Sequence, residues 1–142
     1  MVAVRPHDAD RYLAAPPAGI RLFLIYGNDA GAVTERARLV ERVALQRGGG
    51  DTALRFGSDM IADNPGLLAD EARSASLFGG EPVVSLRILD GRHNVLGALR
   101  GLFEQPPDAA WVMVEAGELK PDSALRKAFE ASLHAAAVAT FH

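Results

Sequence analysis

Two adjoining segments decide the fold: residues 20–26 (IRLFLIY) and residues 27–34 (GNDAGAVT). The first is nearly continuous in apolar residues, which is typical of a β-strand buried on both faces of a parallel sheet. The second contains two glycines and leads into apolar residues at helical spacing. A buried strand that turns through glycine into a helix predicts an α/β domain.

The helix predicted after this turn has a recognisable start and end. Asn28 or Asp29 can cap its N-terminus, and the three glycines of residues 48–50 end it. Its inward face consists of apolar residues at helical spacing: Val33, Ala37, Val40 and Ala44.

Four further apolar runs are predicted strands, and helical patterns separate them. The strands are residues 52–56, 82–89, 110–115 and 135–141. The helices are predicted to begin at Asn64-Pro65 with Leu68 and Ala72 inward, to use Leu96, Leu99 and Phe103, and to use Leu125, Phe129 and Leu133 after a cap at Asp122 or Ser123. Strict alternation of strands and helices predicts a three-layer α/β fold with a parallel five-stranded sheet.

The domain organisation follows from the same pattern. Residues 1–19 are predicted to form an N-terminal strap with one short helix, residues 8–14, which Pro16-Pro17 ends. Residues 20–142 form a single α/β domain, in which we find no repeat and no linker to a second domain.

The composition of the 142 residues predicts a folded, cytoplasmic domain. Hydrophobic residues make up 49% and charged residues 23%, close to the average for soluble domains. There is no cysteine, which excludes both a disulfide framework and a thiolate metal site. The net charge of −3 offers no broad attraction to DNA, and the run of residues 20–26 is too short to cross a membrane.

The glycine turn stands where a P-loop ATPase carries the pattern G-x-x-x-x-G-K-[ST]. Gly27 matches the first glycine, and Thr34 matches the final hydroxyl residue. Ala32 replaces the second glycine, and Val33 replaces the lysine that contacts the β- and γ-phosphates. The segment is therefore a degenerate phosphate loop, and the missing lysine argues against ATP hydrolysis.

A purely structural interpretation of this turn stays open, in which Gly27 and Gly31 make a tight connection between strand and helix. Asp29 adds a negative charge that would repel phosphate. Asp90 ends the third predicted strand, where such ATPases hold a magnesium-binding acid, but Gly91 replaces the glutamate that usually follows. Asp90 alone is typical of a turn or a helix cap.

A neighbouring apolar pair, Leu77-Phe78, lies between serines and two glycines in residues 74–80 (SASLFGG). Adjacent side chains on a strand or helix point in different directions, so both reach one target most easily from an irregular loop. One interpretation is that the pair completes the local core. The other is an exposed apolar plug, which soluble proteins tolerate chiefly when a partner covers it.

Three segments together resemble one family: LFLIYGNDAG, SLFGGEPVV and VEAGELKPDSALRKAFE, in this order. They are similar to the first domain of the δ subunit of bacterial DNA polymerase III, a clamp-loader subunit. The resemblance implies an AAA+-like P-loop NTPase fold with the sheet order 5-1-4-3-2 and no bound nucleotide. It also implies that two further domains follow in the family, the last of which assembles with other loader subunits.

The resemblance further implies a binding role without catalysis, cofactor or metal. Leu77 and Phe78 match the Leu-Phe pair that enters a hydrophobic pocket on the sliding clamp, and Ser76 matches the residue before it. Ala75 stands where some relatives carry a bulkier apolar residue. The implied partners are the sliding clamp and the other loader subunits, with DNA contacted through the assembled complex and no membrane.

Two other classes of protein fit parts of the pattern. A phospho-receiver domain has a similar length and five strands, and Asp90 would be its acceptor, but it needs a second acid after the first strand and a lysine near the last. An active nucleotide-binding enzyme would need a lysine at Val33. The histidines are scattered without a partner at metal-ligand spacing: His7, His93, His134 and His142.

Overall fold

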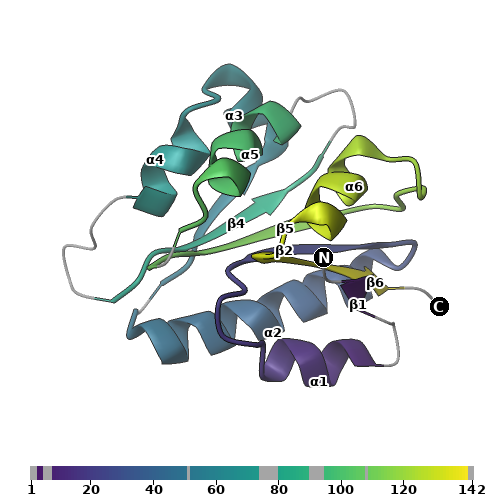
Figure 1. Cartoon of the computed structure of the whole chain (residues 1–142), viewed down its shortest axis with the longest axis horizontal. Helices are drawn as coiled ribbons and strands as arrows, with labels where there is room; N and C mark the ends of the chain where they lie inside the picture. The colour runs from purple at the N-terminus through teal and green to yellow at the C-terminus, as the bar shows by residue number, and fades with distance from the viewer. Residues whose placement is uncertain are drawn as a thin grey trace.

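A computed structural model describes residues 3–4, 8–50, 52–73, 80–89, 95–107 and 109–140, the first pair by backbone alone. Its centre is a parallel sheet in which six strands are described (Figure 1). The strands are β1 (Ala3–Val4), β2 (Leu22–Gly27), β3 (Leu54–Gly57), β4 (Val83–Arg87), β5 (Trp111–Ala116) and β6 (Ala135–Thr140).

The strand order is β1-β6-β2-β5-β4-β3, and every described pair is parallel. If β2 to β6 are counted as strands one to five, this order is 5-1-4-3-2. The predicted α/β class, the parallel sheet and its order are therefore confirmed. The additional strand β1 extends the edge of the sheet by pairing with β6.

Helices cover both faces of the sheet (Figure 1). On one face lie α1 (Ala9–Ala14) and α2 (Ala30–Gly48). On the other face lie α3 (Ser58–Asp63), α4 (Leu67–Arg73), α5 (Val95–Glu104) and α6 (Ala124–Ala131). Within the described residues, we find no helix whose length and apolar character would let it span a bilayer.

The apolar run of β2 supplies both layers of the core because its side chains alternate between the two faces. Leu22 and Leu24 pack with the helices α3 to α6. Phe23 and Ile25 pack against α1 and α2. All residues of β2 are buried, which explains why this strand is nearly continuous in apolar residues.

Helix α2 begins and ends where the sequence predicts. Asp29 caps its N-terminus, and Gly49 follows its last residue in the left-handed conformation with φ of 75°. The predicted inward residues are all buried: Val33, Ala37, Val40 and Ala44.

Three predicted details are wrong. The helix expected from Asn64-Pro65 is two helices, α3 and α4, and Pro65 lies in the turn between them; consequently helices and strands do not strictly alternate. Leu133 is 74% exposed because α6 ends at Ala131. The strap of residues 1–19 contains the predicted helix as α1, but it also contributes β1 to the sheet, which the prediction of five strands omitted.

Candidate functional site

The first glycine of the turn is required by close packing of two strands. Gly27 ends β2 and has φ of 155°. A Cβ atom added here would overlap the backbone carbonyl of Thr140 in β6. Gly31 is different, because the nearest atom to an added Cβ is Asp29 Oδ1 at 3.6 Å, an ordinary contact. Only the first of these two glycines is therefore demanded by sheet geometry.

The N-terminus of α2 carries its own negative group. Asp29 Oδ1 accepts a hydrogen bond from the backbone N–H of Ala32 at 3.1 Å. The backbone N–H of Val33 donates to the carbonyl oxygen of Asp29 at 2.9 Å. In phosphate-binding loops, the N–H groups at this end of the helix point at the ligand. In this chain a side-chain carboxylate occupies that position as a helix cap.

Val33, at the position of the missing lysine, belongs to the core. Its side chain is 3% exposed and packs in the same cluster as Phe23 and Ile25. A lysine at a phosphate site has to extend toward the ligand with its ammonium group outside the core. The Val33 side chain instead packs α2 against the sheet.

Thr34 retains a hydroxyl, but the hydroxyl is bound to protein groups. Its Oγ1 donates to Glu115 Oε1 at 2.9 Å, and Thr34 Oγ1 in turn accepts a hydrogen bond from Arg87 Nη2 at 3.3 Å. In a working phosphate loop this hydroxyl binds Mg²⁺. Thr34 instead joins a cluster of charged side chains between α2 and the sheet.

This charged cluster contains two buried carboxylates and three arginines. The side chains of Glu41 and Glu115 are 3% and 5% exposed. Arg38 bridges them, with Nη1 at 2.7 Å from Glu41 Oε2 and 3.4 Å from Glu115 Oε2. Arg55 pairs with Glu41 at 3.0 Å, and Arg87 pairs with Glu115 at 3.4 Å. Each buried carboxylate thus has two cationic partners, as buried charges require.

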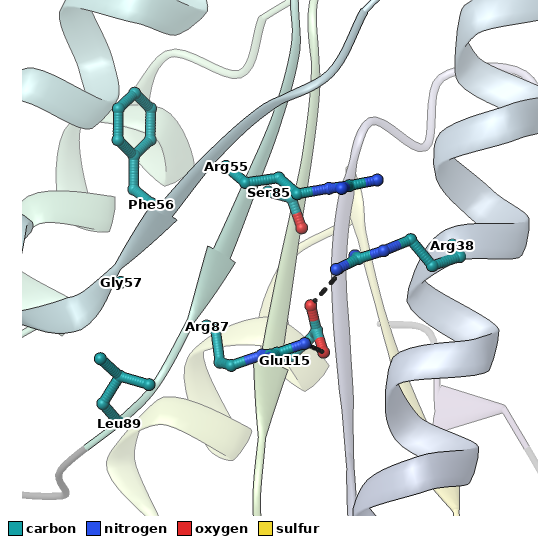
Figure 2. A pocket seen from close by; sticks show the side chains of 8 residues that line it. All are labelled: Arg38, Arg55, Phe56, Gly57, Ser85, Arg87, Leu89 and Glu115. Carbon is teal, nitrogen blue, oxygen red and sulfur yellow. Dashed lines mark hydrogen bonds and ion pairs between the residues drawn. The ribbon is translucent and has the colours of Figure 1, made fainter.

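The cluster borders a cavity of about 260 Å³ (Figure 2). Arg55 extends from β3, Arg87 extends from β4, and Arg38 extends from α2. Ser85 and Glu115 lie between them on the floor of the cavity. This cluster was not among the residues predicted from the sequence. The available signal was a polar residue in each apolar strand, namely Ser85 in VVSLR and Glu115 in WVMVEA.

Tyr26 lies immediately before the glycine turn on the opposite face of the sheet. Burial raises the pKa of its hydroxyl, the nearby Arg126 guanidinium lowers it, and Glu130 raises it. Arg126 lies over the ring, with Cζ 5.3 Å from the ring centre. Among the residues that the structure describes, no group of three or more His, Asp or Glu side chains is placed to hold a metal ion.

The predicted clamp-binding residues lie outside the described residues: Ala75, Ser76, Leu77 and Phe78. Asp90 also lies outside them. The described residues on the N-terminal side of this segment end with Arg73, the last residue of α4. Its Nη2 donates to the carbonyl oxygen of Gly101 in α5 at 3.2 Å. The residue before the segment of residues 74–79 is therefore hydrogen-bonded to α5.

The C-terminal side of the segment is anchored at the other layer. Gly80 has φ of 85°, and an added Cβ would lie 2.7 Å from the backbone carbonyl group of Gly49. The backbone N–H of Glu81 donates to Gly48 at 2.9 Å. The Glu81 carboxylate accepts from both Arg21 Nη1 at 3.1 Å and Trp111 Nε1 at 3.2 Å. These contacts fix where the chain enters β4.

The sheet order and the helices on both faces define an α/β protein with a doubly covered parallel sheet. Among solved structures, the chain is similar to the DNA clamp loader delta protein (YqeN) of Bacillus subtilis, with a TM-score of 0.67 and 14% sequence identity. The similarity covers 95% of this chain and 42% of that chain, so this chain spans less than half of its length. No protein-family model and no curated protein gives a significant match. At this identity the similarity shows a shared fold.

Proposed function

We propose that this chain is the first domain of a clamp-loader subunit that binds a sliding clamp through the apolar pair Leu77-Phe78. In this proposal the domain does not bind or hydrolyse ATP. The observation that carries it is the combination of a fold shared with a clamp-loader delta protein and a buried Val33 at the lysine position of the phosphate loop. The shared fold supports the class of protein, and the buried Val33 supports a role in binding without ATP hydrolysis.

The chemistry of the glycine turn supports the absence of ATP hydrolysis. A triphosphate needs positive charge and free N–H donors at the N-terminus of α2. Val33 supplies no charge, and Asp29 adds a negative charge while it accepts the N–H of Ala32. The hydroxyl of Thr34 is bound to Glu115 and Arg87. Each of the three groups would have to be rearranged before nucleotide could bind.

Leu77 and Phe78 supply the binding energy in this proposal. Burying two large apolar side chains in a pocket on the clamp contributes roughly 1.5–3 kcal/mol each, before the costs of association. The anchors at Arg73 and Glu81 support the proposal, because a segment held at both ends loses less conformational freedom on binding. Ser76 and Ala75 would border the same contact.

Ring opening in this proposal comes from differential binding. A ligand shifts a conformational equilibrium only by the difference between its affinities for the two states. The domain must therefore bind the open clamp interface more tightly than the closed one. Contacts with other loader subunits and with DNA are assigned to further domains and to the assembled complex, consistent with the net charge of −3 on this chain.

The proposal is tested by measuring clamp affinity for the double variant Leu77→Ala with Phe78→Ala. We expect the affinity to fall by at least about 100-fold, as for paired hot-spot residues. A matched control removes two apolar side chains that are exposed elsewhere, Met60→Ala with Leu133→Ala, and should leave the affinity within about two-fold.

Thermal unfolding of the same variants separates the two interpretations of the apolar pair. If Leu77 and Phe78 bind a partner, the unfolding midpoint of the double variant stays within about 2 °C of the wild type. A fall of 10 °C or more, of the order expected for truncated core residues, would assign the pair to the core and remove the basis of the proposal.

A further inference from the structure

The sheet face under α2 changes character along the strands. At the start of β4 and β5, Val83 and Trp111 are buried in the apolar cluster beneath α2. Further along the same face, β4 carries Ser85 and Arg87, and in β5 the buried Met113 is followed by Glu115. Parallel sheets are normally apolar on both covered faces. A polar patch at the carboxyl ends of these strands therefore needs a reason other than packing.

The carboxyl ends of strands in open α/β sheets are where ligands bind. Here β3 lies at one edge of the described sheet, and α2 packs mainly against β2, β5 and β4. Beside α2, the side chains of β3 and β4 are therefore covered less completely. The cavity of about 260 Å³ lies there. The cavity is smaller than the 300–1,000 Å³ typical of sites for drug-sized ligands. Its size suits a small polar group.

The charge along the cavity is positive. Its lining contains the guanidinium groups of Arg38, Arg55 and Arg87 and the carboxylate of Glu115. Glu41 does not line the cavity but pairs with Arg38 and Arg55. The three arginines and the two carboxylates together carry a net charge of +1. Each guanidinium carries five N–H donors, and the hydrogen bonds described here use only some of them. The lining therefore has unused capacity to donate to an anion.

The arginines that the strands contribute to the cavity are accessible to solvent. The side chains of Arg55 and Arg87 are 57% and 49% exposed, while Arg38 is 27% exposed. Ser85 contributes a hydroxyl at the floor, between Arg38 and Arg55 (Figure 2). Planar guanidinium groups that converge from two layers match the several oxygens of a phosphate group better than a single lysine would.

We propose that this cleft, formed by Arg38, Arg55, Arg87 and Ser85, binds a phosphate group. No residue of the degenerate phosphate loop, residues 27–34, lines the cavity, although Thr34 contacts Arg87 and Glu115 at its border. It is also independent of clamp binding, which is assigned to residues 75–78. The phosphate group comes either from a free phosphate or monoester, or from the backbone of DNA, and both sources present the same oxygens to the arginines.

The test is a titration of the ¹⁵N-labelled protein with inorganic phosphate, in which chloride is adjusted to keep the ionic strength constant. We expect saturable shifts of the Nε–H signals of Arg55 and Arg87. Arg55→Gln and Arg87→Gln should each weaken binding by about ten-fold, because each removes a charge-assisted donor. Both variants should fold, since Glu41 and Glu115 each keep Arg38 as a partner.

Two further variants keep the test sharp. Ser85→Ala removes one neutral donor without changing charge and should weaken phosphate binding about three-fold. Arg11→Gln makes the same charge change as the arginine variants at an exposed position of α1, with a side chain that is 85% exposed, and should leave the affinity unchanged. Equal weakening in Arg11→Gln would show nonspecific attraction and would overturn the proposal.

A second arm of the experiment identifies the source of the phosphate. If a short DNA duplex shifts the Arg55 and Arg87 signals and inorganic phosphate competes with it, the ligand is the DNA backbone. If inorganic phosphate or a phosphomonoester shifts these signals and DNA does not, the ligand is a small phosphate compound. If neither shifts them beyond a chloride control of equal ionic strength, the cleft is an internal ion-pair cluster and the proposal is wrong.

Discussion

The first turn of α2 and the cleft about two turns further along the same helix differ in the charges that they carry. In the turn, the helix N-terminus is occupied by Asp29, and the lysine position is filled by the buried Val33. In the cleft, Arg38 and two arginines from the strands surround a cavity that is open to solvent. The turn therefore carries a negative cap and an apolar side chain, whereas the neighbouring cleft carries cationic donors.

The difference arises from what each region must do for the fold. The turn begins at Gly27, where β2 packs closely against β6, and Val33 at its far end completes the core. The cleft lies beside the edge strand β3, where α2 covers the sheet less completely. Gly27 and Val33 are thus held by packing, whereas the arginines of the cleft border a cavity. The comparison predicts that variants in the turn affect stability and variants in the cleft affect binding.

Gly27→Ala is expected to have the largest effect on stability. The new Cβ would overlap the Thr140 carbonyl, so β2 and β6 would have to separate, at a cost of about 4 kcal/mol in the free energy of unfolding. Gly31→Ala is the matched control in the same turn; because it lies in a helix without close contacts, it should be neutral or stabilise by up to about 1 kcal/mol. Urea denaturation of both variants measures the difference. Equal effects would contradict the packing argument.

Glu115→Gln should lower the free energy of unfolding by about 3 kcal/mol, because it leaves Arg38 and Arg87 with one carboxylate fewer in a buried cluster. Glu130→Gln removes a carboxylate from a partly exposed pair with Arg126 and should cost below about 0.5 kcal/mol. Guanidinium chloride would screen these pairs, so urea is again the denaturant of choice. A small effect for Glu115 would mean that the cluster does not join α2 to the sheet.

Val33→Lys restores the lysine of the phosphate-loop pattern. We expect it to destabilise the domain by about 2 kcal/mol, since an ammonium group must leave the core through a longer side chain. Val33→Met adds length without charge and should cost less. Calorimetric titration with Mg-ADP should detect no binding to either variant. Binding by the lysine variant would show that the turn is a phosphate site that lacks one charge.

Asp29→Ala is expected to have the smallest effect, about 1 kcal/mol, because it removes one capping hydrogen bond to Ala32. Asp29→Asn keeps an acceptor at the same place and should be close to neutral. The thermal unfolding midpoints of the two variants distinguish the loss of the hydrogen bond from the loss of charge. An equal loss for Asn and for Ala would mean that the charge at the helix end, rather than the capping hydrogen bond, stabilises α2.

The regular parts of the fold could be predicted because their signals are local. The apolar run of β2 and the glycines after α2 mark an element and its end, and the structure confirms both. The sheet order followed from the family resemblance. The strand β1 could not be predicted, because two residues carry no periodic pattern. Pro65 was read as a helix start because proline suits the first turn, but it equally suits the turn that separates α3 and α4.

The candidate sites differ in the same way. The glycine turn is one segment, so its motif and missing lysine are visible in the sequence. The cleft joins three arginines that are 17 or more residues apart in the sequence, Arg38, Arg55 and Arg87. The parallel register of β3, β4 and β5 and the packing of α2 on the sheet bring them together. The apolar pair at Leu77-Phe78 was found from the sequence, and its role stays a prediction because it lies outside the described residues.

The most direct test of this account is the dissociation constant of the chain with a purified sliding clamp, measured with and without Mg-ATP. We predict clear binding and the same constant, within about two-fold, in both conditions, because the turn that would read nucleotide is closed by Asp29 and Val33. No binding in either condition, or binding that requires ATP, would contradict the assignment of this domain to nucleotide-independent clamp binding.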